Sequence, residues 1–144
     1  MVESDTIKLL RECDAGAKMG IKSISDVIDQ VKSDEFKRIL NDNKYEHEKL
    51  ENEIQEELIR FKDDGKDPNP IAVGMSWMKT SLKIGIKNSD KTIADVMTDG
   101  CNMGVKSLNS YLNKYGAADE KSKSLTKKLI CTEENMAEAM KAFL

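Results

Sequence analysis

Apolar residues recur every three or four positions along most of the chain, which is the spacing of one face of an α-helix. The first such stripe lies within residues 4–32, and its members are Ile7, Leu10, Asp14, Ala17, Ile21, Ile24, Ile28 and Val31. A second stripe lies beside it, formed by Leu9, Cys13, Gly16, Gly20, Ile24 and Val27. Because a helix with two adjacent stripes contacts two neighbours, we predict a helix inside a bundle, with Ser4 or Asp5 as its N-cap.

Three further stripes predict three further long helices. The second helix should begin at Ser33-Asp34 and end near Gly65, with an inward face of Phe36, Leu40, Asn43, His47, Leu50, Ile54, Leu58 and Phe61. A later one should span residues 91–115, with Ile93, Met97, Gly100, Gly104, Leu108, Tyr111 and Tyr115 in register. The last is capped by Asp119 and turns inward Leu125, Leu129, Thr132, Met136, Ala139 and Phe143.

The segment between the second helix and residue 90 predicts a crossover. Residues 66–70 contain both prolines of the chain and are expected to form a loop. A shorter helix over residues 71–87 should follow, about 25 Å long, which is enough to travel most of the length of the bundle. A crossover of this kind makes the second and fourth helices parallel, whereas the very short link between the first two makes them an antiparallel hairpin.

The chain also contains an internal repeat. Residues 16–24 read GAKMGIKSI and residues 100–108 read GCNMGVKSL, with five of nine positions identical and an offset of 84 residues. The order of the predicted helices repeats as well, which favours duplication of a helical hairpin. We therefore predict one all-α domain, residues 1–144, with hairpins at 4–65 and 90–144 and a crossover at 66–89.

Composition narrows the class of protein. The chain has 144 residues, of which 34% are charged and 39% hydrophobic, with a net charge of −3. This is typical of one soluble globular domain, and the absence of a basic excess argues against nucleic-acid binding. The odd number of cysteines and the acidic start predict a cytoplasmic protein without a disulfide scaffold or signal peptide. No stretch approaches 18 apolar residues, so no membrane span is expected.

Four short segments carry a resemblance to a known group of proteins. They are Cys13-Asp14-Ala15-Gly16, Glu46-His47-Glu48-Lys49-Leu50, Met75-Ser76-Trp77 and Asp99-Gly100-Cys101. With the order of helices, they make residues 7–144 similar to the ferritin-like superfamily, and most similar to a bacterial family of small ferritin-like domains of uncharacterised function. The resemblance implies a four-helix bundle made of two duplicated hairpins joined by a crossover helix.

The resemblance also implies positions for two metal ions, and this chain departs from that pattern. Ferritin-like centres use one Glu from each of two helices and Glu-x-x-His from each of the other two. The corresponding positions here are Ala17, Cys101, Lys44-x-x-His47, and either Leu129-x-x-Thr132 or Glu133-x-x-Met136. The metal site is therefore expected to be degenerate, with no cofactor. Iron or zinc would be the metal if a reduced set of Asp14, His47, Cys101 and Glu133 binds one.

Each residue of that reduced set has an alternative interpretation. His47, the only histidine, is either a residual ligand or a core imidazole hydrogen-bonded to Asp14 or Glu51. Asp14 lies on a core stripe, so it needs a pairing partner or a metal. The cysteines are either small buried hydrophobes or a soft metal site, and they are Cys13, Cys101 and Cys131.

Two glycine pairs in the repeat need a structural explanation, because a glycine inside a helix lowers the stability of the helix by about 1 kcal/mol relative to alanine. They are Gly16 with Gly20 and Gly100 with Gly104. We interpret them as a close crossing of the first and fourth helices that closes the space used for metal in relatives. The alternative is a partly exposed edge that tolerates glycine. On the first interpretation, Gly104→Leu should overpack the crossing and destabilise the protein.

The sequence thus predicts a non-catalytic binding or scaffold module, acting on a protein partner or on a second copy of itself in a homodimer. No phosphate loop, nucleophile elbow or Ser-His-Asp arrangement is present, so an enzymatic role is not favoured. The alternative is a metal-binding or iron-oxidising ferritin-like protein that uses the reduced ligand set.

Overall fold

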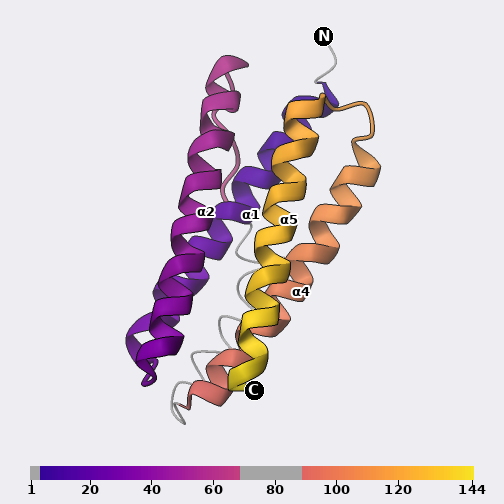
Figure 1. The fold of residues 1–144 in the computed structure, drawn as a ribbon. Coiled ribbons are helices and arrows are strands. Elements are labelled where there is room, and N and C mark those ends of the chain that lie inside the picture. Colours follow the sequence, from indigo (N-terminus) through magenta and orange to yellow (C-terminus); the bar gives the residue numbers. More distant parts are fainter. Residues whose placement is uncertain (1–3, 69–88) are drawn as a thin grey trace.

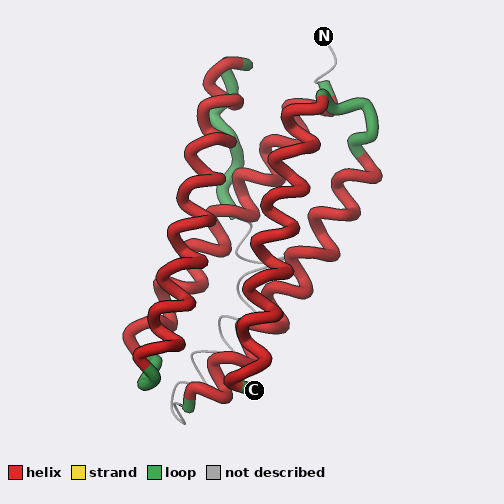
Figure 2. The backbone as a smooth tube through the Cα atoms, in the orientation of Figure 1, coloured by secondary structure: helices red, strands yellow, loops and turns green. Residues whose placement is uncertain are grey.

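A computed structural model describes residues 4–68 and 89–144, and in these residues the protein is a bundle of four long helices with no strand (Figures 1 and 2). The helices are α1 (Asp5–Val27), α2 (Asp34–Arg60), α4 (Asp90–Lys114) and α5 (Glu120–Met140). Two single 3₁₀ turns follow α1 and α5, namely η1 (Ile28–Gln30) and η4 (Lys141–Phe143). The prediction of an all-α bundle is confirmed.

Each helix begins at the residue that its cap predicts. A side-chain oxygen accepts a hydrogen bond from a backbone N–H of the first turn at Ser4, Ser33, Ser89 and Asp119. These bonds satisfy donors that would otherwise have no partner at a helix start. Short polar residues therefore fix all four starting points, and Ser4 rather than Asp5 caps α1.

The helices pair as two antiparallel hairpins, α1 with α2 and α4 with α5 (Figure 1). The helices α2 and α4 run in the same direction, which is the relation that a crossover between the hairpins requires. Helix α1 also contacts α4 and α5, and α2 contacts α5. The crossover helix predicted over residues 71–87 lies outside the described residues.

The apolar interior forms two clusters, one toward each end of the bundle. One cluster contains Leu9, Leu10, Cys13, Ala17, Leu50, Ile54, Leu58, Leu108, Ala118, Leu125, Leu129 and Ile130. The other contains Ile24, Val27, Val31, Phe36, Leu40, Ile93, Ala94, Met97, Cys101, Met136 and Met140. Buried His47 on α2 and Glu133 on α5 lie between the two sets in sequence, so the bundle has a polar layer near its middle.

Two predicted helix ends are wrong. The first helix stops at Val27 and gives way to a 3₁₀ turn, instead of continuing to residue 32. The second stops at Arg60 rather than near Gly65, because Lys62 already adopts the left-handed φ of 57° and reverses the chain. Residues 61–68 then return along the bundle, held by Asp63, whose Oδ1 lies 2.6 Å from Nη2 of Arg11.

Candidate functional site

The polar layer is built around His47, whose side chain is fully buried. Its Nδ1 lies 2.8 Å from the carbonyl oxygen of Asn43, and its Nε2 lies 2.5 Å from Oε1 of Glu133. A carbonyl oxygen only accepts, so Nδ1 carries a proton and donates it. The sequence had proposed Asp14 or Glu51 as the partner of this histidine. That prediction is wrong, because the periodicity of one helix does not reveal which distant helix faces it.

The environment favours a charged imidazole. Burial alone lowers the pKa of His47, but the hydrogen bond and the negative charge of Glu133 outweigh it, so the pKa is raised above its ordinary value. The layer therefore stabilises the charged form of His47 beside Glu133. Both ring nitrogens are occupied within the protein, which leaves no free nitrogen to act as a general base.

The glycines of the repeat make room for this pair. A methyl group at Gly20 on α1 would lie 2.5 Å from Nε2 of His47, and one at Gly104 on α4 would lie 3.2 Å from Oε2 of Glu133. At Gly16 a methyl group would have only ordinary contacts, 3.7–3.8 Å from two leucines. Gly20 and Gly104 are thus needed by side chains of α2 and α5 rather than by a close approach of two backbones.

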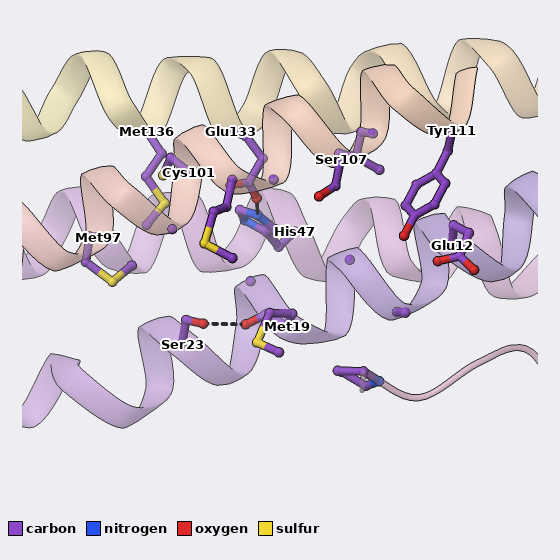
Figure 3. A pocket seen from close by; sticks show the side chains of 18 of the residues that line it. Glu12, Met19, Ser23, His47, Met97, Cys101, Ser107, Tyr111, Glu133 and Met136 are labelled. Carbon is purple, nitrogen blue, oxygen red and sulfur yellow. Dashed lines mark hydrogen bonds and ion pairs between the residues drawn. The ribbon is translucent and has the colours of Figure 1, made fainter. Parts of the chain in front are cut away.

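The space between α1 and α4 is also open rather than closed, which corrects the second half of the glycine interpretation. A cavity of about 260 Å³ lies there, and all four repeat glycines line it (Figure 3). Glycines widen a groove because they carry no side chain to fill it. The cavity runs from Met97 and Ser23 at one end to Tyr111 and Glu12 at the other, with the His47–Glu133 pair between them.

Most of the cavity wall is apolar, and its charges are balanced. Four methionines of the described part of the chain line it, namely Met19, Met97, Met103 and Met136. Of the charged side chains in the wall, His47 is paired with Glu133, and Nζ of Lys66 lies 2.5 Å from Oε1 of Glu12. Burial, and then the charge of Glu12, raises the pKa of Tyr111, which stays neutral. Among the described residues of the wall, each charged side chain is therefore matched by one of opposite charge.

Cys101 lines the cavity from α4 and is almost completely buried (Figure 3). Its pKa is raised first by burial and then by the charge of Glu133 and a hydrogen bond to it. Because the thiol is protonated and His47 has no free nitrogen, the arrangement lacks the thiolate and the base of a nucleophilic cysteine.

The other two cysteines lie elsewhere. Sγ of Cys13 is 3.0 Å from Oγ1 of Thr126, and burial raises the pKa of this thiol to about 12. Cys131 is exposed, which contradicts the interpretation of all three as buried hydrophobes. The three cysteines therefore do not form one site.

Asp14 belongs to a second polar cluster. Its buried carboxylate accepts hydrogen bonds from Nζ of Lys18, Nε2 of Gln55 and the backbone N–H of Lys66, at 2.7–2.9 Å. The pKa of Asp14 is lowered, because these donors and a neighbouring Glu51 outweigh the effect of burial. Asp14 is thus paired, as its place on a core stripe requires, and is not a ligand at the central layer.

Sequence reasoning missed how Glu51 contributes to this cluster. Its Oε2 is buried without a hydrogen-bond partner, and burial together with Asp14 raises the pKa of Glu51 to about 8. Glu51 therefore holds a proton at neutral pH, and the two carboxyl groups share one negative charge. The sequence indicates only that Glu51 and Gln55 lie one turn apart on α2 and can form a hydrogen bond with each other.

The residues present do not fit a dinuclear iron centre. The structure selects Glu133-x-x-Met136 as the inward pair of α5, since Thr132 is only partly buried. Of the implied ligand positions, only His47 and Glu133 carry the imidazole or carboxylate that an iron centre uses, and these two bind each other. In residues 4–68 and 89–144, no three His, Cys, Asp or Glu side chains lie close enough together to hold a metal ion.

Comparison with known proteins finds no matching family model, curated protein or solved structure. None of the helices in the described part of the chain has the length and apolarity needed to cross a bilayer. The fold and the site together define a four-helix bundle with a buried ion pair and a cavity in its side.

Proposed function

We propose that the chain is a non-catalytic binding module, built on a ferritin-like bundle with a degenerate metal centre, and that its ligand occupies the cavity between α1 and α4. The observation that carries this proposal is the cavity itself, apolar in most of its wall and crossed by the buried His47–Glu133 pair. Pockets of this kind, with few polar groups at fixed places, are the usual form of a small-molecule site.

The ferritin-like part of the proposal is supported by three features. They are the four-helix all-α architecture, the parallel direction of α2 and α4, and the repeat that relates residues 16–24 to residues 100–108. In such bundles the centre is where ligands and metals are held. Here the corresponding space is bordered largely by glycines and methionines, and its central carboxylate, Glu133, is bound to His47.

The non-catalytic part follows from the state of each ionisable group in the wall. Both nitrogens of His47 are engaged, and the thiol of Cys101 is protonated. Lys66 and Glu12 bind each other at the far end. General acid–base or nucleophilic catalysis needs a group that can give or take a proton at the substrate, and the described wall offers none that is free.

The wall also restricts the ligand. Charge balance favours a ligand that adds no net charge, and four thioethers favour one with an adaptable, apolar fit. We place the module in the cytoplasm, where its free cysteines are stable, and without nucleic acid or membrane as partners. A protein partner or a second copy of the chain would receive or present the ligand.

An apolar fluorescent probe that brightens in dry sites tests the proposal. Wild type should bind it saturably, and Gly16→Leu should weaken binding at least ~10-fold, because the leucine fills the cavity while its Cβ is tolerated. Asn102→Leu places the same apolar side chain at an exposed position of α4 outside the cavity wall and should bind like wild type. Equal affinity in all three proteins would contradict the proposal.

A metal-binding or iron-oxidising function on the reduced ligand set is the second candidate. One observation favours it, namely that three of the four residues, His47, Cys101 and Glu133, reach the same cavity. The fourth, Asp14, is committed to Lys18, Gln55 and the loop. Without Asp14 the reduced set keeps one carboxylate, Glu133, and this group is already bound to His47.

A further inference from the structure

We propose that the cavity binds the soft monovalent ion Cu(I), through Sγ of Cys101 and the thioethers of Met97 and Met136. This inference rests on the proposed function, since it names a ligand for the same cavity. It differs from the iron or zinc alternative in both the metal and the residues that hold it.

The helix spacing places the three side chains in the wall of the same cavity. Met97 and Cys101 are four residues apart on α4 and so lie on one face of that helix, and Met136 reaches the same place from α5. All three side chains are at most 3% exposed and belong to one core cluster. Figure 3 shows them at one end of the cavity, with Met19 of α1 facing them from the other side.

The donor types select the metal. Thiolate and thioether sulfur are soft ligands that favour Cu(I), whereas non-haem iron sites use carboxylate and imidazole. The harder groups nearby, His47 and Glu133, are occupied with each other. Methionine side chains are flexible enough to close around a small ion that enters a larger cavity.

The charge balance of the wall points to an ion of charge +1. When Cu(I) binds, the Cys101 S–H bond breaks, an S–Cu bond forms and the proton leaves to solvent, with no change of oxidation state. One positive charge replaces another, so the wall stays neutral. A divalent ion at the same thiolate would leave one positive charge uncompensated beside a paired His47–Glu133 layer.

The test is an anaerobic titration of the full-length protein with Cu(I) in competition with a coloured chelator, bathocuproine disulfonate. Cys131→Ser is the background, since this exposed thiol would bind copper without any built site. One equivalent of Cu(I) should bind tightly in that background. Adding Cys101→Ser should weaken binding at least ~100-fold, and adding Met97→Leu with Met136→Leu should weaken it ~10–100-fold.

Cys13→Ser is the matched control, because Cys13 is also buried but contacts Thr126 away from the cavity. It should retain wild-type stoichiometry and affinity, and circular dichroism should show all variants folded. The methionine pair keeps its volume in the leucine variants, so a loss of copper there reports on sulfur rather than on folding.

Two results would overturn the inference. One is a stoichiometry and affinity unchanged by Cys101→Ser, and the other is loss of all tight binding in the Cys131→Ser background. The apolar probe separates these failures from a failure of the proposed function. Probe binding that persists without copper binding removes Cu(I) as the ligand and leaves the cavity as the binding site, whereas loss of both removes the site itself.

Discussion

At the scale of single residues, small side chains at the centre of the bundle face large side chains on neighbouring helices. Gly20 and Gly104 have no side chain because His47 and Glu133, on other helices, occupy the room that a Cβ would need. The buried ion pair in turn depends on both partners, since one charge alone in the interior is costly. Small and large residues at this layer therefore constrain each other across all four helices.

Gly20→Ala should destabilise the protein by about 1–3 kcal/mol, because the methyl group meets the ring of His47, which is held at both nitrogens. Gly16→Ala is the matched control one turn earlier. There the methyl group has ordinary contacts, so the higher helix propensity of alanine should stabilise the protein by up to about 1 kcal/mol. Denaturant melts decide between them, and equal effects would contradict the account. Gly104→Leu is also expected to destabilise the protein, because the leucine would press against the side chain of Glu133.

The ion pair predicts a dependence of stability on pH. The pKa of His47 is raised in the folded state, so its stabilisation is fully present below about pH 6.5 and is lost as the pH rises through the folded pKa. We expect the free energy of unfolding of wild type, measured relative to a His47→Leu, Glu133→Leu double variant, to fall above pH 6.5. The reference variant cancels the contribution of Glu51, whose raised pKa has the same sign. A difference that is constant from pH 5 to pH 9 would contradict the charged pair.

At the scale of elements, helix starts, faces and hairpin pairing could be predicted, whereas two helix ends and the residue contacts between helices could not. Caps are local, so Ser4, Ser33 and Asp119 could be predicted from the sequence. The end of α2 was misplaced because Gly65 resembled a C-terminal glycine. Its positive φ instead brings residues 65 and 66 against Asp14. This contact joins residues about 50 positions apart, so the periodicity of a single helix cannot predict it.

That contact makes Gly65 sensitive to substitution. Gly65→Ala should destabilise the protein by more than ~1 kcal/mol, because φ is 82° and the new methyl group would collide with the carboxylate of Asp14. Gly116→Ala is the control, since its nearest contact is 3.9 Å away and its φ is not in the left-handed region. It should be neutral or slightly stabilising. The midpoints of urea unfolding compare the two, and a neutral Gly65→Ala would show that the loop does not depend on this turn.

At the scale of the whole molecule, the site consists of contacts between helices that the sequence presents separately. His47, Cys101 and Glu133 could each be singled out from their stripes, but their meeting place could not. The repeat glycines stand out in the sequence, but the cavity that they line does not, because a gap between helices leaves no periodic pattern. Asp14 was grouped with the central residues, although the turn after α2 assigns it to another cluster.

The loss of ligands predicts an outcome for iron. After aerobic and anaerobic loading with Fe(II) and removal of excess metal, elemental analysis should find no stoichiometric iron, and no iron-dependent oxidase activity should appear. The reason is that Ala17, Lys44 and Cys101 stand where carboxylates are needed. Two irons per chain would contradict the degenerate centre and restore the second candidate function.

The most direct test of the cavity as the ligand site is nuclear magnetic resonance of methionine methyl groups during titration with the apolar probe. The account predicts that the signals of Met19, Met97, Met103 and Met136 shift together and saturate with one binding constant. Met140, which is buried in the same core but outside the cavity wall, should stay in place. Saturable binding that moves Met140 or no methionine, and leaves the four wall residues unchanged, would contradict the claim.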